Sequence, residues 1–431
     1  MRVDIYIRLA GMMLLQYAVW GAWLPVAARL LGAPVSDGGL GFDGRQVGWI
    51  LGLGGSIGAI CAPFIAGQFA DRVFSTERVL AVLLAVGGAI QWTLASQTSF
   101  SAWLGLSIAY SIVYMPTLAL TNSLALSHLS DAKREFPWVR VWGTIGWIAA
   151  SWAFPVFFLQ TDLKLSAQPP FLIWSEREDV IRLLNNALRF SGGMSIVYAF
   201  LCLFLPHTPP KRDAVEKLAF ARAARLFRRP SFTLLVIVSL AIAAIHNIYF
   251  IQTPNFLPSV GLKTSHIGPA MTVGQFAELL ILPTLGLMLT TLGFRAVITL
   301  GCLAYAARFA VFGTTSLPLS VIVASQALHG LCYACFFAAS YIYVDRIAPA
   351  DVRHSAQTLI GILILGGGPV VGGYLSGLLS ERFSSVTAEE VLVVDYRAMW
   401  YTLSWIGLMC AAVITVFFRD ESSSDASEAE Q

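Results

Sequence analysis

The stretch HTPPKRDAVEKLAFARAARLFRRPS, residues 207–231, lies in the middle of a chain that otherwise consists mostly of long apolar runs. Between 207 and 229 it carries seven basic residues and two acidic ones. Six apolar runs precede it and six follow it. A basic segment of this kind is typical of an amphipathic helix that lies on the inner leaflet of a membrane. The pattern therefore predicts a linker, 207–229, between two six-helix halves.

Composition points to lipid as the main solvent. The 431-residue chain is 57% hydrophobic and 12% charged, whereas soluble domains carry about 25% charged residues. A span needs about 20 mostly apolar residues. Twelve runs of about this length occur, near 8–30, 46–69, 78–96, 101–126, 140–160, 188–206, 231–257, 268–291, 296–314, 317–343, 355–379 and 398–418. We therefore predict an all-α polytopic membrane protein with twelve transmembrane helices. The first run is interpreted as a span, since it lacks the cleavage site of a signal peptide.

The distribution of Lys and Arg predicts the orientation. If the N-terminus is cytoplasmic and the spans alternate, inside segments hold 18 basic residues and outside segments hold 9. The positive-inside rule then places both termini in the cytoplasm, as expected for a multi-pass protein of the plasma (inner) membrane. We expect four parts: an N-terminal half at 1–206, the linker at 207–229, a C-terminal half at 230–418, and a disordered acidic tail at 419–431.

A carboxylate within the eighth predicted span is a candidate functional group. Glu278 lies well inside this span, and Gln275 lies three residues earlier on the same helix face. A charge at the bilayer centre costs about 2.5–3.5 kcal/mol, so such residues usually have a function. The pattern favours a carboxylate and an amide that face one cavity. The alternative is a structural ion pair between helices, with Arg308 of the ninth span as the partner.

A second candidate set begins the fifth predicted span. Arg140, Thr144 and Trp147 follow each other at i, i+4 and i+7, so they project from one helix face. A guanidinium, a hydroxyl and an aromatic ring in a row suit a polar ligand with a flat ring. The alternative is an arginine whose charge extends to the membrane interface. Gln16, Trp20 and Trp23 repeat the spacing in the first span, where the tryptophans are equally typical of interface anchors.

Three further sets of residues are open to more than one interpretation. Asn247 in the seventh span either lines a cavity or bonds a neighbouring helix. His246 and His329 are more typical of histidines bonded within a core than of proton relays. Gly67, Asp71 and Arg72 follow the second span in GQFADR. They predict a conformational latch, in which the glycine allows close helix approach and the aspartate caps a helix or pairs with a basic residue; the alternative is a solvated turn.

The sequence gives little support for catalysis or for a bound metal. It contains no Ser/His/Asp set, no H-E-x-x-H and no phosphate-binding glycine loop. Cys332 and Cys335 form a C-x-x-C, but inside an apolar run they are interpreted as small packing residues. We expect no cofactor, no metal, no enzyme activity and, at a net charge of +3, no nucleic-acid partner.

Several stretches resemble one known family. They are WGAW (Trp20–Trp23), YMPTL (Tyr114–Leu118), FPWVRVWGTIGW (Phe136–Trp147), LPHTPP (Leu205–Pro210), QFAELL (Gln275–Leu280), AARFAVFG (Ala306–Gly313) and VRHSAQ (Val352–Gln357). Together they resemble the nucleoside:proton symporters, the nucleoside permeases of the major facilitator superfamily. The resemblance runs from the first span to the eleventh. It implies two six-helix halves around a midplane cavity and uptake of nucleosides by proton symport through alternating access.

The resemblance also implies roles for individual residues. Arg140, Thr144, Gln275 and Glu278 match positions that bind nucleoside in the family. Trp147 stands where the family has a phenylalanine and could still stack on a base. Substrate-binding residues are therefore expected to be Arg140, Thr144, Trp147, Asn247, Gln275 and Glu278.

Other positions depart from the family pattern. Asn247 stands where a glutamine is expected, and Phe250 where an asparagine is expected. On the tenth span Gly330 replaces a tyrosine, Ala334 a phenylalanine and Cys335 an aspartate. The smaller residues predict a wider pocket unless Tyr333 and His329 refill it. Loss of the aspartate leaves Glu278 as the proton-coupling candidate.

The function predicted from the sequence is import of nucleosides with protons by a monomer. Partners would be the nucleoside or another small polar solute, protons and the lipid bilayer. Two alternatives stay open at this point. One is a transporter of a sugar or small metabolite on the same scaffold, and the other is a transport-dead membrane sensor.

Overall fold

The computed structural model describes residues 2–65, 74–167, 172–209, 224–349, 352–386 and 392–420. The predicted latch residues Gly67, Asp71 and Arg72 lie outside these ranges, as do most of the basic linker and residues 421–431 of the tail. Within the described ranges the chain is mainly helical, and ten segments are long and apolar enough to cross a membrane. One of them, Thr264–Gly313, is 50 residues long and holds two helices.

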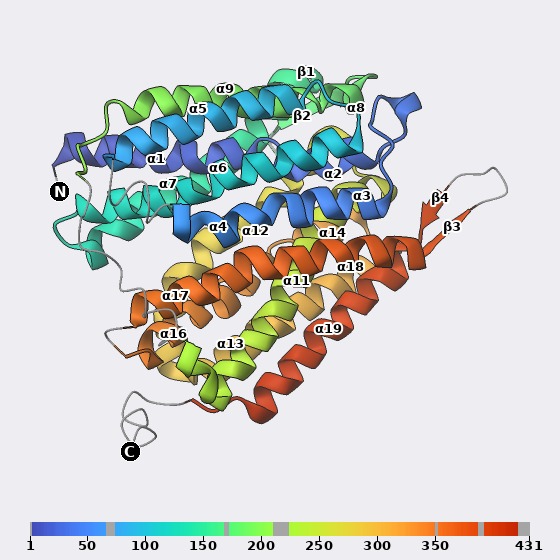
Figure 1. Cartoon of the computed structure of the whole chain (residues 1–431). Helices are drawn as coiled ribbons and strands as arrows, with labels where there is room; N and C mark the ends of the chain where they lie inside the picture. The colour runs from blue at the N-terminus through green and yellow to red at the C-terminus, as the bar shows by residue number, and fades with distance from the viewer. Residues whose placement is uncertain are drawn as a thin grey trace. The chain divides into compact units, whose positions relative to one another are not determined.

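The described helices of the first part of the chain correspond to the six predicted spans; Figure 1 shows these helices in blue to green. They comprise α1 (Val3–Gly21) with α2 (Leu24–Gly32), α3 (Gly44–Gly48) with a π-helical turn and α4 (Gly55–Ile65), α5 (Thr76–Leu94), α6 (Phe100–Ser127), α7 (Ala132–Phe158), and α8 (Val180–Leu183) with α9 (Asn186–Cys202). The 17 residues of α9 leave it just outside the ten long segments.

The second part forms the other six. They comprise α11 (Pro230–Ser259), α12 (Ile267–Ile281) continuing into α13 (Leu285–Gly313), α14 (Leu319–Ser325), α15 (Leu328–Leu331) and α16 (Ala339–Ile347), α17 (Arg353–Ile362) with α18 (Gly368–Arg382), and α19 (Tyr396–Phe417). Within α13 the chain reverses at Gly293, which adopts φ 76° and ψ 166°. Few residues other than glycine adopt this conformation, so Gly293 separates the eighth span from the ninth and the total is twelve.

Two short hairpins interrupt the helices, and neither was expected from the sequence. Strand β1 (Gln160–Leu165) pairs antiparallel with β2 (Leu172–Glu176), between α7 and α8. Strand β3 (Ser384–Val386) pairs antiparallel with β4 (Leu392–Val394), between α18 and α19. Both lie in polar connections that follow a transmembrane helix (Figure 1).

By its internal contacts the chain divides into two compact units. Unit 1 contains residues 1–213 and 250–272, and unit 2 contains 214–249 and 273–431. Residues 250–272, which the sequence places in the C-terminal half, thus pack with the N-terminal residues. The boundaries fall within α11 and within α12, so both of these helices contribute to both units.

Small residues and buried polar bonds hold unit 1 together. Helix α9 runs beside both α5 and α1 (Figure 1). A Cβ at Gly146 of α7 would lie 2.0 Å from the Leu14 carbonyl oxygen of α1, so only glycine allows this approach. Gln16 is fully buried, donates from Nε2 to Thr117 Oγ1 at 2.9 Å and accepts from Thr121 Oγ1 at 3.0 Å. Its amide therefore bonds the neighbouring helix α6 and does not continue a ligand stripe with Trp20.

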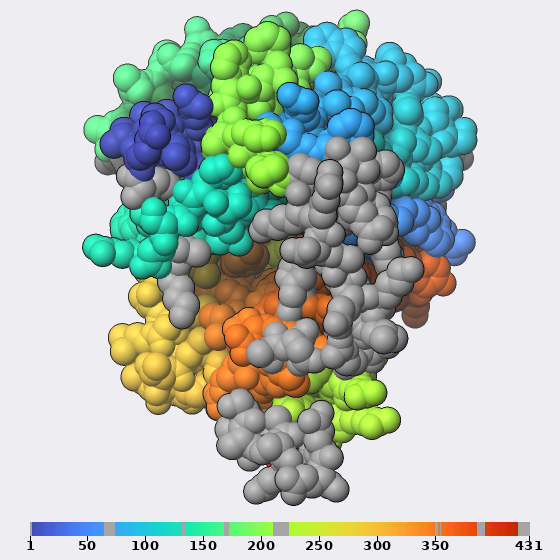
Figure 2. Space-filling model, turned by 60° about the vertical axis from the view of Figure 1, so that its left-hand side comes forward, coloured from blue at the N-terminus to red at the C-terminus, as the bar shows by residue number. Residues whose placement is uncertain are grey.

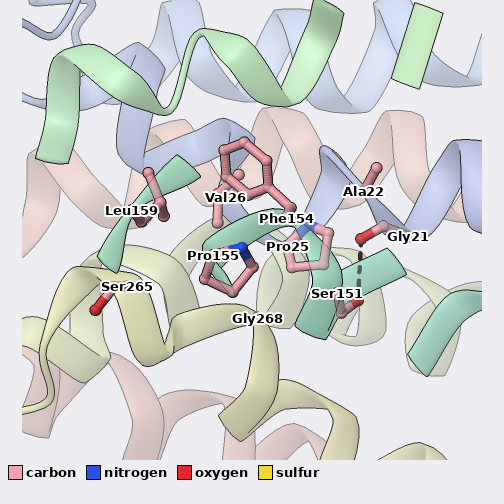
Figure 3. A pocket seen from close by; sticks show the side chains of 10 residues that line it. All are labelled: Gly21, Ala22, Pro25, Val26, Ser151, Phe154, Pro155, Leu159, Ser265 and Gly268. Carbon is pink, nitrogen blue, oxygen red and sulfur yellow. Dashed lines mark hydrogen bonds between the residues drawn. The ribbon is translucent and has the colours of Figure 1, made fainter. Parts of the chain in front are cut away.

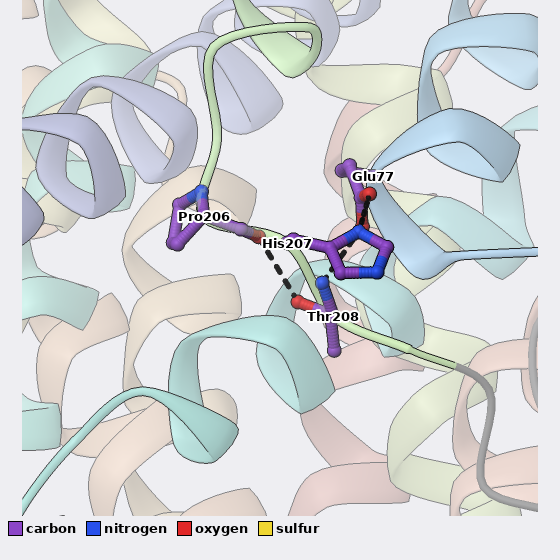
Figure 4. A network of polar contacts seen from close by, with 4 residues as sticks. All are labelled: Glu77, Pro206, His207 and Thr208. Atoms are coloured by element: carbon purple, nitrogen blue, oxygen red, sulfur yellow. Dashed lines mark hydrogen bonds and ion pairs between the residues drawn. The ribbon is translucent and has the colours of Figure 1, made fainter.

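The start of the linker is tied to the beginning of α5 (Figure 4). Glu77 accepts hydrogen bonds from Thr208 N–H at 3.1 Å and lies 2.8 Å from His207 Nδ1. Its side chain is buried, whereas that of His207 is exposed. On the neighbouring surface, α1 and the end of α9 lie next to each other (Figure 2, dark blue and light green), where Arg8 donates to the Phe204 carbonyl at 3.0 Å.

Candidate functional site

The predicted residues of α7 lie against α1 in unit 1. The guanidinium of Arg140 is centred 4.2 Å from the Tyr17 ring, a cation–π arrangement. Gly143 permits it, because a Cβ there would lie 2.6 Å from Tyr17 Cδ2. Arg140 and Thr144 are both half-buried. The charge of Arg140 therefore lies beside an aromatic ring of the neighbouring helix.

Trp147 forms the next part of this face. It is 8% exposed, and its backbone approaches Gly21, where a Cβ would lie 2.8 Å from the Trp147 carbonyl oxygen. Its ring meets Trp20 edge-on, with centroids 5.8 Å apart at 74°. It also meets Phe250 edge-on at 6.3 Å and 72°. Three aromatic side chains thus form a corner, and edge-to-face contacts of this kind hold rings in fixed orientations.

Phe250 also contributes a ring to this aromatic group, although from the sequence it is only a departure from the family pattern. It replaces an expected asparagine, so unit 1 presents a ring where an amide was expected. Arg140, Thr144 and Trp147 with Phe250 offer a cation, a hydroxyl and aromatic surface. These groups suit a ligand with a flat ring and hydroxyl groups.

Two predicted residues of unit 2, Gln275 and Glu278, lie on the buried side of α12. Gln275 is 9% exposed and Glu278 8% exposed, while Phe276 is 48% and Leu280 76% exposed. This helix therefore turns its apolar side chains outward and its polar ones inward, as expected of a membrane helix that borders a polar interior. The Glu278 side chain is therefore buried within the protein.

Two amide oxygens of unit 2 lack partners among the described residues. They are Gln275 Oε1 and Asn247 Oδ1, both buried atoms. Asn247 lies on α11 where α18 approaches closely, since a Cβ at Gly372 would lie 2.9 Å from Asn247 Cβ. Buried amide oxygens are normally bonded to protein, water or ligand. These two can therefore accept hydrogen bonds from a bound solute.

The tenth span does not widen a pocket at Gly330, contrary to the expectation from its small residue. A Cβ at Gly330 would lie 2.6 Å from the Ala277 carbonyl carbon and 2.8 Å from Glu278 N. The glycine instead lets α15 pack directly on α12. Ala334 and Cys335 are fully buried in the π-helical turn that follows. The backbone of α12 occupies the space that a larger side chain at Gly330 would need.

Arg308 is fully buried in unit 2, where it contacts His329 and the rings of Tyr249, Tyr305 and Phe309. Its Nη1 lies 3.0 Å from His329 Nδ1, and its guanidinium is centred 4.0 Å from the Tyr249 ring. A guanidinium only donates hydrogen bonds, so Nδ1 of His329 must accept, and the proton of a neutral ring is then on Nε2. His246 stacks on His329 at 5.4 Å and lies 2.8 Å from the Tyr305 hydroxyl. Both histidines thus belong to a buried network around Arg308.

The predicted site residues that the structure describes form no recognisable metal site, and they do not line the small pocket of unit 1. Among the described residues no group of three or more His, Cys, Asp or Glu could hold a metal ion. The pocket in Figure 3 lies between the break of α1 and α2, α7 and the start of α12, and contains none of the predicted site residues. It is lined mainly by apolar side chains, with Ser151 donating to the Gly21 carbonyl at 3.0 Å.

Comparison with known proteins identifies the family. A family model described as nucleoside H+ symporter matches residues 3–423. The chain belongs to the nucleoside H+ symporter family. A relative of this symporter is the putative nucleoside transporter YegT of Escherichia coli (strain K12), 31% identical over 424 residues that cover 96% of this chain and 94% of the relative. Xanthosine permease of the same organism is 26% identical over 438 residues, covering 97% and 96%.

Solved structures show the fold of this symporter. The crystal structure of the nucleoside transporter NupG matches with a TM-score of 0.80 at 23% identity, covering 97% of this chain and all of that one. A crystal structure of a D-xylose–proton symporter matches with a TM-score of 0.69 at 13% identity, covering 96% and 98%. The fold is therefore the major facilitator fold, with twelve helices in two six-helix halves, as the resemblance implied.

Proposed function

We propose that this symporter imports nucleosides together with protons by alternating access. The observation that carries the proposal is the match to the nucleoside H+ symporter family over residues 3–423, almost the whole chain. The local geometry supports it, because each unit presents the chemistry that a nucleoside requires. Unit 1 supplies aromatic surface for a base, and unit 2 supplies amide oxygens that accept from hydroxyl or amino groups.

We infer that six residues contact the substrate: Arg140, Thr144, Trp147, Asn247, Gln275 and Glu278. On this proposal Trp147 lies against the base, held by its edge contacts with Trp20 and Phe250. Arg140 and Thr144 donate to oxygens of the nucleoside. Gln275 and Asn247 accept from it through the oxygens that have no partner among the described residues.

Glu278 is proposed to carry the proton. It is a carboxylate on the buried stripe of a membrane helix, one turn from Gln275. A carboxylate can take up and release a proton in each cycle, whereas an amide at the same place cannot. The aspartate that the family has on the tenth span is replaced here by Cys335, which is fully buried in an apolar environment. Thiols in such surroundings remain inert.

The proposed setting is the plasma (inner) membrane, with both termini in the cytoplasm and the chain acting as a monomer. The excess of basic residues in the segments assigned to the inside supports this orientation. Gly67, Asp71 and Arg72 would act as the conformational latch on the same side. The linker would then lie on the cytoplasmic leaflet, with its beginning held by Glu77.

The proposal is tested by uptake of radiolabelled uridine into proteoliposomes, with and without an inward proton gradient. We expect accumulation only with the gradient, competed by unlabelled nucleosides and not by sugars. Empty liposomes and a proton ionophore serve as controls. Uptake that a sugar abolishes and that no nucleoside affects would show a different substrate, and uptake that ignores the gradient would contradict proton coupling.

A further inference from the structure

The hairpin formed by β1 and β2 is mostly exposed, with one exception. Trp174 of β2 is 3% exposed, whereas its neighbours Ile173 and Ser175 are exposed. An isolated two-stranded hairpin is marginally stable in water. The burial of Trp174 therefore indicates that the hairpin is docked on the rest of unit 1 through this residue.

Trp174 and Glu176 dock on the turn between α11 and α12, a short 3-10 helix, η5 (Thr264–His266). Trp174 Nε1 donates to Ser265 Oγ at 3.0 Å, and its ring stacks on His266 with centroids 4.4 Å apart at 19°. Glu176 Oε2 accepts from Ser265 N–H at 2.7 Å. Two residues of the hairpin thus engage both the backbone and the side chains of the turn.

Further contacts extend this attachment. Trp152 of α7 meets Trp174 edge-on at 6.5 Å and donates to Thr272 Oγ1 of α12 at 2.9 Å. Asn255 of α11 donates to the Ala28 carbonyl of α2 at 3.3 Å. Ser265 also lines the pocket shown in Figure 3, next to the break between α1 and α2. The tips of α11 and α12 are therefore fixed to unit 1 from several sides.

These tips belong to helices that carry the proposed substrate residues. Residues 250–272 pack with unit 1, but α11 also carries Asn247 and α12 carries Gln275 and Glu278, all in unit 2. A contact that fixes the tips of two helices to one unit constrains any motion of those helices relative to that unit. Contacts of the hairpin with these tips therefore affect the movement of the helices that carry Asn247, Gln275 and Glu278.

We propose that Trp174 and Glu176, with Ser265 and His266, form a clasp that holds the outer ends of α11 and α12 on unit 1 and must release before a nucleoside enters from outside. We call these four residues the hairpin clasp. The proposal rests on the proposed function and orientation, which put the hairpin on the outer side. The four are positioning residues: they control access to the site without touching the substrate.

The first experiment measures clasp opening without any substrate. Ser265 is 1% exposed, so Ser265→Cys should react slowly with a membrane-impermeant maleimide applied from outside to the full-length protein in membranes. Adding Trp174→Ala should raise the labelling rate at least several-fold, while Trp174→Phe, which keeps an aromatic ring over His266, should stay close to the parent. Ser175→Cys, on the exposed side of β2, should label rapidly in every background and controls for reagent access.

The second experiment measures whether release belongs to the transport cycle. In Glu176→Cys with Ser265→Cys, a short bifunctional thiol reagent should join the two residues and reduce uridine uptake to background. A reducing agent that cleaves the cross-link should restore uptake. In each single-cysteine variant, the bifunctional reagent should leave uptake unchanged. The untreated and treated wild type control for the six native cysteines.

The outcomes separate the clasp from the proposed function. The clasp proposal is overturned if Ser265→Cys is labelled at the same rate with and without Trp174→Ala. It is also overturned if the cross-linked protein keeps full uptake. A wild type that takes up no nucleoside overturns the proposed function, while the labelling comparison still decides whether the clasp opens.

Discussion

Replacing Glu278 by Gln should separate substrate binding from proton coupling. The side chain is 8% exposed on the inward stripe of α12, and glutamine has nearly the same shape. Burying a carboxylate at this depth costs about 2.5–3.5 kcal/mol, and an amide costs less, so we expect normal expression and folding. Gln keeps one acceptor oxygen for the substrate. It cannot take up a proton, so accumulation should be lost.

The size of the loss follows from the driving force on one proton. Moving one charge across 100 mV is worth about 2.3 kcal/mol, which corresponds to about a 50-fold accumulation of a neutral nucleoside. The Glu278→Gln variant should therefore equilibrate uridine at a ratio near one, while the wild type accumulates it about 50-fold at this potential. Exchange of labelled for unlabelled uridine should persist, because it requires no net proton movement.

The assay compares net uptake and exchange in the same proteoliposomes at a fixed potential. Glu381→Gln, an exposed carboxylate at the end of α18, serves as the matched control and should accumulate uridine like the wild type. If Glu278→Gln still accumulates uridine with the pH dependence of the wild type, the proton site lies elsewhere, and His246 and His329 become the next candidates. Loss of folded protein would instead assign Glu278 a structural role.

Three further predictions concern binding and packing. Arg140→Ala and Gln275→Ala should each weaken nucleoside affinity, by about 10- to 100-fold for the arginine because hydrogen bonds to charged groups contribute about 1.5–3 kcal/mol; unchanged affinity in calorimetry would remove them from the site. Arg308→Ala should lower the free energy of unfolding by about 3 kcal/mol or more, because His329 loses its hydrogen-bond donor and Tyr249 loses its cation. Thermal unfolding in detergent measures this effect. An unchanged midpoint would show that the guanidinium does not stabilise unit 2. Gly146→Ala should reduce the yield of folded protein, because its Cβ would lie 2.0 Å from a backbone oxygen. The control Gly193→Ala should be tolerated, because a Cβ there meets nothing within 4 Å. Equal yields of the two variants in size-exclusion chromatography would contradict the packing argument.

The apolar runs predicted the spans because their signal is local. A helix must satisfy its backbone hydrogen bonds within lipid, and the bilayer sets its length, so run lengths alone place twelve spans. The structure places the turn between the eighth and ninth spans at Gly293, whose φ of 76° favours glycine. The inward direction of Gln275 and Glu278 also follows from their spacing, because Phe276 and Leu280 between and after them must face outward.

The roles of Gln16, Gly330 and Trp174 depend on which helices pack against each other, and local sequence patterns do not predict that packing. Gln16 has the spacing of a ligand residue, yet Thr117 and Thr121 of another helix use its amide. Gly330 suggested a wider pocket, yet the backbone of α12 takes up that space. Trp174 stands in a polar connection, and only the folded chain brings it onto Ser265, 91 residues away. A side chain's chemistry is set by its type, but its role is set by the partners within a few ångströms, and long-range packing chooses those partners.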